Sequence, residues 1–539
     1  MFIREKRNPS GSISIQIISK RNGKYKVVET IGCAKNDLEK ELLLLKAKDR
    51  LKELEPRLFY FEEDEKEKNN SFGKIDFSND RLVPIGDEVI FGKMYDELGC
   101  SKVFSKIKSL YSKNEKDFLF KSLVISRILY PGSKLYLRDY LYYFKNMEIT
   151  EDKIYRFLDT LYQEDIKLQI EKCVYESTLK KIGGKLIVCF YDVTTLHFES
   201  ESEDDLRIIG FSKEGKLNRP QIQLGLFTTT EGYPLSYDIY QGNKFEGHTL
   251  KENLQKFQDR FKLSKDNKPI VVADRGMLNK DNLIFLENNS YSYILGAKIK
   301  TFPSEIKEYI SNLEFQSDEQ TYEIYLDRDN NFIKDNKQDS KEIKYRLILS
   351  FSTQRMKKDK YLREKHLNKL KEKIENSPTI TKSDLKSPYK KYLDLKNDNN
   401  NCNITFKLNE EKVKLDEKLD GIKGYLTNDF RLSHNEIITH YTNLHFIEEA
   451  FRISKTDLRI RPIYHRLEDR IKAHILISFV AYAIYRDFTI KIKKHDIKIT
   501  RKILRDLIKH IFAIKTDDKL IPLKLSNIQQ QIYDALFEN

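Results

Sequence analysis

The sequence predicts an α/β fold, and three observations carry that prediction. Residues 186–191 form a short, continuous apolar run and residues 269–274 a second one that ends in an acid, and such runs are typical of strands buried on both faces. Residues 221–229 and 233–240 read as two further strands joined by a turn that contains glycine. Between 84 and 182 the apolar residues instead recur three and four positions apart, which indicates helices.

The remaining elements follow in an order that identifies the topology. Periodicity predicts helices over 247–261 and 279–289, a strand over 291–299, a returning strand over 421–429, and a long helix that begins near Ser433. Three strands in a meander, a helix, a strand and then a helix that bears an acid is the element order of a ribonuclease H-like fold. In that topology the first and fourth strands lie side by side and parallel, so residues at their ends face one crevice.

Around this core we expect a small N-terminal β module, a partly β insertion domain, and helical N- and C-terminal regions. The N-terminal module should contain a hairpin turned at Asn22-Gly23 and a charged helix over 37–55, followed by a polar linker over 61–82. The expected parts are 1–60 (β-hairpin and helix, possible DNA end binding), 84–184 (helical, DNA-binding or pre-catalytic), 185–299 (core, first part), 300–420 (insertion), 421–486 (core, second part) and 487–539 (basic C-terminal region). We expect the insertion to form a separate lobe beside the sheet and its Lys-rich helix near 355–376 to face DNA or solvent.

The composition points to a polyanionic partner. The chain has 97 Lys and Arg against 83 Asp and Glu, a formal net charge of +14, and a pI of about 9.1. This excess favours nucleic acid first and an anionic membrane surface second, although a Lys-rich composition drifting with an AT-rich genome is an alternative.

The cysteines and the apolar runs bear on the compartment. The five cysteines are far apart and show no C-x-x-C spacing, so neither a disulfide framework nor a zinc site is expected. The N-terminus lacks the apolar core of a signal peptide, and the run over 474–485 is too short to span a bilayer. A soluble protein of the cytoplasm is therefore expected.

Two aspartates close the buried strands. Asp192 is predicted to end the first strand and Asp274 the fourth. A carboxylate at such a place is costly unless it is solvated or paired, and a divalent cation such as Mg²⁺ or Mn²⁺ offsets that cost. For each aspartate alone, a strand-end cap or a turn residue is the alternative, and their matching places in the fold order favour a shared site.

A third acid lies on the helix that follows Ser433. At about 100° per residue, six side chains form one narrow stripe on that helix. They are Ile437, Tyr441, Leu444, Glu448, Phe451 and Lys455. Glu448 stands in the middle of this largely apolar stripe and needs a partner, whereas Glu449 points towards the flank or solvent. A metal shared with the two aspartates is one partner, and an ion pair with Arg452 or Lys455 is the alternative.

At these positions the sequence resembles the DDE transposases of bacterial insertion sequences, in the group that carries a Tyr-x2-Arg-x3-Glu-x6-Lys (YREK) signature. The signature segment reads YTNLHFIEEAFRISK (441–455), and the blocks around the two aspartates read YDVTT (191–195) and VVADRG (271–276). The matching signature positions are Tyr441, Glu448 and Lys455. The resemblance covers roughly 186–299 and 421–486.

The resemblance implies a function and a set of partners. It implies that Asp192, Asp274 and Glu448 are the catalytic, metal-binding triad of a transposase with two divalent cations, Mg²⁺ or Mn²⁺. It also implies cleavage of phosphodiester bonds at transposon ends and strand transfer into target DNA. The expected partners are double-stranded DNA, both terminal inverted repeats and target, and a second copy of the chain in a synaptic complex at the nucleoid.

Two features depart from the family pattern. Leu444 stands where the signature has Arg, so a phosphate contact is missing or moved, and Arg452 or Arg459 are candidates to replace it. The chain also has no Trp, on which some relatives stack a flipped base during hairpin formation; a Tyr or Phe could do this here, and the use of a hairpin intermediate stays open.

Five residues near the site are candidate DNA contacts. They are Tyr441, Lys455, Arg452, Lys298 and Lys300. Four of them have a simpler structural explanation: Tyr441 as a core phenol, Lys455 as a lysine that extends to solvent, and the pair Lys298 and Lys300 as solvated lysines alternating along a strand.

Three other functions compete with that of a transposase. A related metal nuclease would cut DNA without joining it, and a domesticated DNA-binding protein would have lost catalysis, although all three acids are present here. A structural or membrane-surface protein would leave the acid at Glu448 unexplained.

Overall fold

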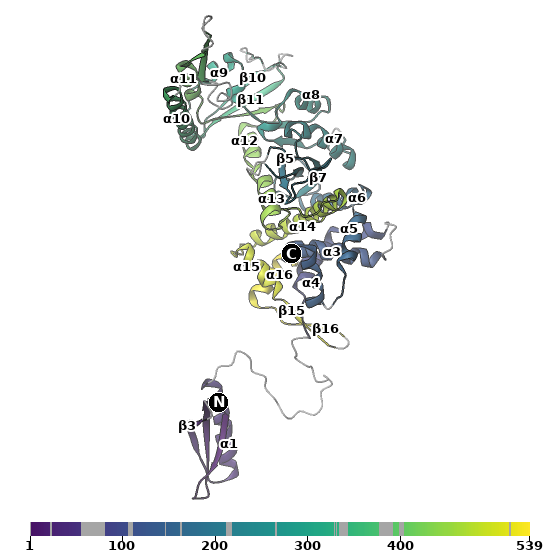
Figure 1. Cartoon of the computed structure of the whole chain (residues 1–539), viewed down its shortest axis with the longest axis vertical. Coiled ribbons are helices and arrows are strands. Elements are labelled where there is room, and N and C mark those ends of the chain that lie inside the picture. The colour runs from purple at the N-terminus through teal and green to yellow at the C-terminus, as the bar shows by residue number, and fades with distance from the viewer. Residues whose placement is uncertain are drawn as a thin grey trace. The chain divides into compact units, whose positions relative to one another are not determined.

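The computed structural model divides the chain into two units, Met1–Asp76 and Phe77–Asn539 (Figure 1). The residues that it describes are 2–21, 24–54, 81–105, 112–145, 147–161, 164–211, 218–264, 267–327, 329, 331, 333, 343–376, 392–397, 404–516 and 519–538. Across this part of the chain, none of the helices combines the length and the apolar character needed to span a bilayer.

The first unit is a three-stranded antiparallel sheet with one helix. Its elements are β1 (Phe2–Arg7), β2 (Ile13–Arg21), β3 (Lys24–Ala34) and α1 (Asp37–Leu54). Arg21 pairs with Lys24, which confirms the hairpin, although its two turn residues lie outside the described residues. The predicted linker lies outside them too, except for its last two positions. The strand β1 was not predicted, because its sequence FIREKR is mostly charged and exposed.

A helical region opens the second unit, as the 3.6-residue periodicity predicted. Its elements are β4 (Leu82–Pro84), a π-helix (Asp87–Gly92), α2 (Lys93–Leu98), a 3-10 helix (Cys100–Ser105), α3 (Lys113–Leu129), α4 (Lys134–Lys145), α5 (Glu151–Leu161) and α6 (Glu164–Lys181). These helices pack around α14 (Glu468–Lys494), a helix buried on nearly all sides from Ile471 to Phe488.

The C-terminal residues complete this helical region. They form α15 (Arg501–Lys509), β15 (Phe512–Lys515), β16 (Leu520–Pro522) and α16 (Asn527–Phe537). β15 pairs with β16 on one side and with β4 on the other, so the two ends of the second unit share a small sheet.

An eight-stranded mixed sheet forms the centre of the second unit, in the order β10-β11-β14-β9-β8-β5-β6-β7. The strands are β5 (Val188–His197), β6 (Gln221–Thr228), β7 (Pro234–Gln241), β8 (Ile270–Ala273), β9 (Tyr293–Ala297), β10 (Thr321–Leu326), β11 (Tyr345–Phe351) and β14 (Ile422–Thr427). β5, β6 and β7 form the predicted antiparallel meander, and β8 lies parallel to both β5 and β9. The five strands β7-β6-β5-β8-β9 thus form the expected ribonuclease H-like core.

Alternation along the strands divides the core between the two faces of this sheet. Val188 and Phe190 of β5 pack into the cluster that contains α13 (His445–Thr456) and α14. Cys189 and Tyr191 pack into the opposite cluster, with α7 (Thr249–Phe261) and α8 (Lys280–Asn288). Side chains at even positions of β5 therefore face α13, which matters for the site.

The insertion differs from the prediction, because it is not wholly a separate lobe. β10 and β11 extend the central sheet, with β11 hydrogen-bonded along its length to β14. The strand-like sequences were recognised, but β14 presents an edge that needs a partner, and the pattern alone did not say which strand supplies it. The rest of the insertion comprises α9 (Ser304–Ser311), α10 (Thr353–Asn376), β12 (Leu393–Asn397), β13 (Ile404–Leu408) and α11 (Glu410–Lys418).

A glycine fixes the junction between the insertion and the sheet. Gly421 has a φ of 80°, and a Cβ there would lie 2.8 Å from Met356 Cβ and 2.8 Å from Phe351 Cε2. Close by, the buried side chains of Arg363 and Asp420 form an ion pair that holds α10 against the start of β14.

We predict that Gly421→Ala destabilises the protein more than Gly184→Ala does. Gly184 also has a positive φ, of 85°, but its Cβ would meet open space. Both variants carry backbone strain, and only the first adds an overpacking cost of about 1–3 kcal/mol. Thermal and urea unfolding of the two variants measures the difference, and equal losses would contradict the close packing described for Gly421.

Candidate active site

The register of two parallel strands brings the two aspartates level. Tyr191 of β5 is the partner of Ala273 of β8, so Asp192 and Asp274 are the next residues on adjacent strands. Asp192 occupies an even position and faces α13, and its Oδ1 accepts a hydrogen bond of 2.7 Å from the backbone N–H of Val193.

Asp192 does not end its strand, contrary to the prediction. β5 continues to His197 because it stays paired with β6, where His197 lies opposite Gln221. Only the other neighbour, β8, stops at Ala273, so Asp274 follows the end of its strand as predicted. Asp192 is therefore half-buried where its parallel neighbour ends, and Asp274 is exposed.

Tyr441 holds the carboxylate of Asp274. Its hydroxyl donates a hydrogen bond of 3.0 Å to Asp274 Oδ1, and burial, followed by the charge of Asp274, raises the pKa of the phenol. A Cβ on Gly296 of β9 would lie 2.2 Å from this hydroxyl oxygen, so the glycine leaves room for the ring. In this structure Tyr441 orients an acid, and its predicted contact with DNA stays a prediction.

The helix that bears Glu448 is broken, where one long helix was predicted. Ser433 caps α12 (His434–Thr442) in a capping box with Glu436, and α13 begins at His445, after Asn443 and Leu444. The break leaves Tyr441 and Glu448 facing one cavity. Glu448 is exposed to that cavity, not buried in an apolar face as the stripe predicted.

The three acids line a single cavity of about 420 Å³. The other lining residues are Arg355, Lys423, Tyr425, Tyr441, Thr442, Leu444, His445 and Ile447. Within the described ranges, no three His, Cys, Asp or Glu side chains are gathered closely enough to hold a metal ion. The acids thus share a cavity without forming a compact cluster, and as carboxylates they are the oxygen donors that Mg²⁺ and Mn²⁺ prefer.

Basic side chains line cavities on both sides of the acids. One neighbouring cavity, of about 330 Å³, shares Asp192 and Glu448 and is lined by the predicted Arg452 and Lys455 together with Arg461. The cavity on the other side, of about 920 Å³, shares Asp274 and Tyr441 and is lined by a set of basic residues. These are Arg275, Lys298, Lys300, Arg355, Lys358 and Lys423.

Lys298 and Lys300 do not alternate along a strand as predicted. β9 ends at Ala297, and both lysines lie at a 3-10 turn. The ammonium of Lys300 also lies 3.6 Å from Asp416 Oδ2 and 3.5 Å from Asp420 Oδ1, so part of its charge is already balanced.

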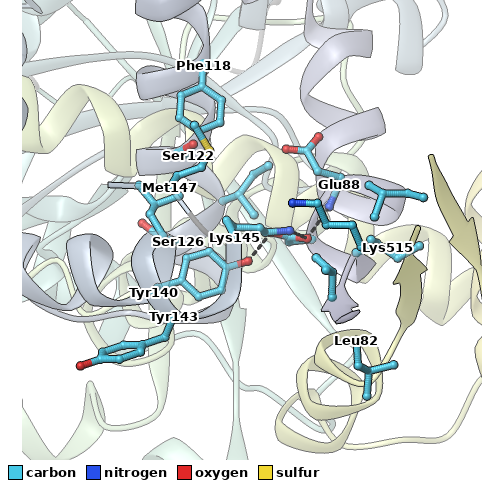
Figure 2. Close-up of a pocket in the computed structure, with 16 residues that line it drawn as sticks. Leu82, Glu88, Phe118, Ser122, Ser126, Tyr140, Tyr143, Lys145, Met147 and Lys515 are labelled. Atoms are coloured by element: carbon cyan, nitrogen blue, oxygen red, sulfur yellow. Dashed lines mark hydrogen bonds and ion pairs between the residues drawn. The ribbon is translucent and has the colours of Figure 1, made fainter. Parts of the chain in front are cut away.

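A further cavity, of about 480 Å³, lies among α3, α4, β4 and β15 (Figure 2). Its buried carboxylate, Asp87, accepts hydrogen bonds from Tyr140 and, at 2.7 Å, from Lys145. Asp87 is thus already paired with a cation, and the second acid that lines this cavity, Glu88, lies 2.9 Å from the ammonium of Lys121.

Comparison with known proteins identifies the family. Residues 183–484 match the model of the transposase DDE domain, and this match spans more than half of the chain and all three acids. The chain belongs to this family. It is a DDE transposase, an enzyme that acts on DNA.

Among solved structures, the transposase is similar to a piggyBac transposase in a synaptic complex with hairpin DNA, at 9% identity and a TM-score of 0.37 over 85% of this chain and 82% of that one. It is also similar to the Mos1 mariner paired end complex with Mn, at 11% identity and a TM-score of 0.15 over 35% and 60% of the two chains. No curated protein matches it.

Glu449 of the transposase has a role that the sequence did not indicate. Its carboxylate lies 2.9 Å from Arg486, 2.7 Å from Arg501 and 3.2 Å from Arg452. Burial raises the pKa of Glu449, but the charge and hydrogen bonds of Arg486 and Arg501 outweigh it and lower that pKa overall. Arg452, the alternative partner proposed for Glu448, is thus paired with Glu449.

Arg486 connects this ion pair to the sheet. Its side chain is 7% exposed, and its Nε donates a hydrogen bond of 2.8 Å to the carbonyl of Glu231 in the turn between β6 and β7. Arg486 therefore fixes α13, and with it Glu448, relative to the strand that carries Asp192. An arginine that follows the long apolar run of this helix was the available sequence signal, because a buried charge needs a partner.

We predict that Glu449→Gln lowers the free energy of unfolding by about 1–3 kcal/mol, because the buried Arg486 loses its charged partner. Glu448→Gln should leave stability near that of the wild type, since Glu448 is exposed to the cavity. Differential scanning calorimetry at neutral pH compares the two. Equal destabilisation by the two substitutions would contradict the distinct roles of these adjacent glutamates.

Proposed function

We propose that Asp192, Asp274 and Glu448 form the catalytic triad and hold two divalent cations, Mg²⁺ or Mn²⁺. The observation that carries this proposal is that the three acids, from β5, β8 and α13, line one cavity. When bound, such cations activate the attacking oxygen and stabilise the leaving oxygen of a phosphodiester. The carboxylates bind and orient, and no side chain has to act as a nucleophile.

The substrate that we propose is the terminal inverted repeat of the element, followed by target DNA. The first cut would use water, and the 3′-hydroxyl that it frees would attack the target strand. The same site serves both steps because its acids select a metal and not a particular nucleophile. Basic residues in the cavities on both sides of the acids support a DNA path across the site. Among them, Arg452, Lys455, Lys298 and Lys300 are the proposed contacts.

We place the protein in the YREK group of bacterial insertion sequences, with its DNA in the nucleoid. The spacing of Tyr441, Glu448 and Lys455 supports this placement. We also propose a homodimer in the synaptic complex, and a role in binding transposon ends for residues 1–60, where Arg4, Lys6 and Lys26 lie on the strands.

The expected parts of the second unit stay proposals as functional modules. The range 84–184 is proposed to contact DNA before catalysis, 185–299 and 421–486 to carry the triad, 300–420 to serve as the insertion, and 487–539 to serve as a basic C-terminal region.

Asp192→Asn, Asp274→Asn and Glu448→Gln should each reduce metal-dependent cleavage at least about 10³-fold, because an amide keeps the shape but lacks the charge that the cation requires. Binding of the terminal repeat should persist. Single-turnover cleavage of a labelled repeat duplex in Mg²⁺ or Mn²⁺ measures the first effect, and gel shift in Ca²⁺ the second. Any of the three variants cleaving at the wild-type rate would remove that residue from the triad. Strand-transfer products from the wild type distinguish a transposase from a nuclease that only cuts.

Affinity for duplex DNA should fall steeply with salt. Each Lys or Arg bound to a phosphate releases counterions, so several such contacts predict a loss of about 10³-fold or more between 50 and 200 mM salt. Fluorescence anisotropy across this range tests it, with the Glu448→Gln variant in Ca²⁺ to prevent cleavage. An affinity that does not change across this salt range would argue against a DNA path lined by basic side chains.

A further inference from the structure

The cavity that the three acids line lacks the arginine of the Tyr-x2-Arg-x3-Glu-x6-Lys signature. Leu444 stands at that position, is 8% exposed, and lines the cavity at the break between α12 and α13. A leucine can contribute packing there but no contact to a phosphate. A cationic side chain beside a scissile phosphodiester stabilises the charge that its oxygens gain in the transition state.

Neither replacement suggested by the sequence borders this cavity. Arg452 is engaged by Glu449 and lines the neighbouring cavity. Arg459 is exposed on the turn after α13, and neither the cavity of the triad nor the two beside it has Arg459 among its lining residues.

Arg355, in the first turn of α10, does border it. Its side chain lines the cavity together with Asp192, Asp274 and Glu448, although it belongs to the insertion. Its Nε lies 3.3 Å from Asp359 Oδ2. Burial raises the pKa of Tyr425, and the charge of Arg355 offsets part of that rise. Among the residues that the structure describes, none accepts a hydrogen bond from its two terminal nitrogens.

The start of α10 is held in place, so the guanidinium is positioned in advance. The backbone N–H and hydroxyl of Thr353 donate to Asp318 Oδ1 at 2.9 and 2.6 Å. Asp359 Oδ2, which orients Arg355, also accepts a hydrogen bond of 3.3 Å from the backbone N–H of Gly421. The turn before β14 thereby fixes the helix, the acid and the arginine together.

We propose that Arg355 supplies, from the insertion, the guanidinium that binds the phosphate at the point of cleavage, in place of the signature arginine. Its Nε is held by Asp359, and its terminal nitrogens present two donors to non-bridging phosphate oxygens, the geometry in which Arg binds phosphate best. Lys423, which lines the same cavity from β14, adds a second cation. This inference rests on the proposed function and assigns one more residue to the same site.

The test moves the arginine back to the signature position. Arg355→Ala should slow single-turnover cleavage of the terminal-repeat duplex about 10²-fold or more, with a thermal midpoint close to that of the wild type. Adding Leu444→Arg to that variant should restore a large part of the rate, because the new guanidinium enters the same cavity. Lys357→Ala, an exposed lysine of the same turn that lines none of these cavities, serves as the matched control and should cleave normally.

The outcomes separate the two proposals. If the wild type cleaves, Glu448→Gln does not, and Arg355→Ala cleaves at the wild-type rate, then the inference about Arg355 is wrong while the triad stands. The inference would also be wrong if Leu444→Arg fails to rescue the slow Arg355→Ala variant while the separate variant Arg355→Lys cleaves at the wild-type rate. Any positive charge at this position would then suffice. If the wild type fails to cleave in Mg²⁺ and in Mn²⁺, the proposed function itself fails.

Discussion

The parallel pairing of β5 with β8 is the constraint on which the rest of the site depends. With Tyr191 opposite Ala273, the two aspartates stand level. Strand alternation turns Asp192 towards the face covered by α13. A slip of one residue in β5 would turn Asp192 into the opposite core, where its carboxylate would meet apolar residues of α7, and would move Cys189 and Tyr191 out of that core. The apolar residues on both faces of β5 therefore fix the register, and the register fixes the acids.

Adjacent glutamates on α13 differ in whether the fold itself pairs their charge. Glu449 is enclosed by arginines that join its helix to α14 and to the turn of the β6–β7 hairpin. Glu448, about 100° around the helix, is left open to the cavity. A paired carboxylate rigidifies its surroundings, whereas an open one keeps its lone pairs for a ligand. The ion pairs of Glu449 fix α13 in place, and Glu448 therefore holds a defined position in the cavity.

Local patterns predicted much of this molecule, and long-range pairing explains what they missed. The meander, the strand before Asp274, the helices α7 and α8 and the pair of aspartates follow from periodicity and from apolar runs. β5 extends beyond Asp192 because it pairs with β6, which begins at Gln221. β11 takes its position by pairing with the open edge of β14, which begins at Ile422. The break between α12 and α13 at Leu444 depends on nearby residues, but it was not predicted. The helical spacing of the apolar residues continues across the break, so the sequence pattern looks like one helix.

The residues of the site differ in how strictly the fold dictates their place in the chain. The aspartates must lie where two parallel strands become level, and a short carboxylate side chain leaves little latitude. A phosphate contact has no such restriction, since an arginine reaches far and needs only an anchored backbone at the rim of the cavity. Because β10, β11 and β14 continue the sheet, they bring the first turn of α10 to that rim. An insertion that extends the sheet can therefore place a cation beside the three acids without itself contributing an acid.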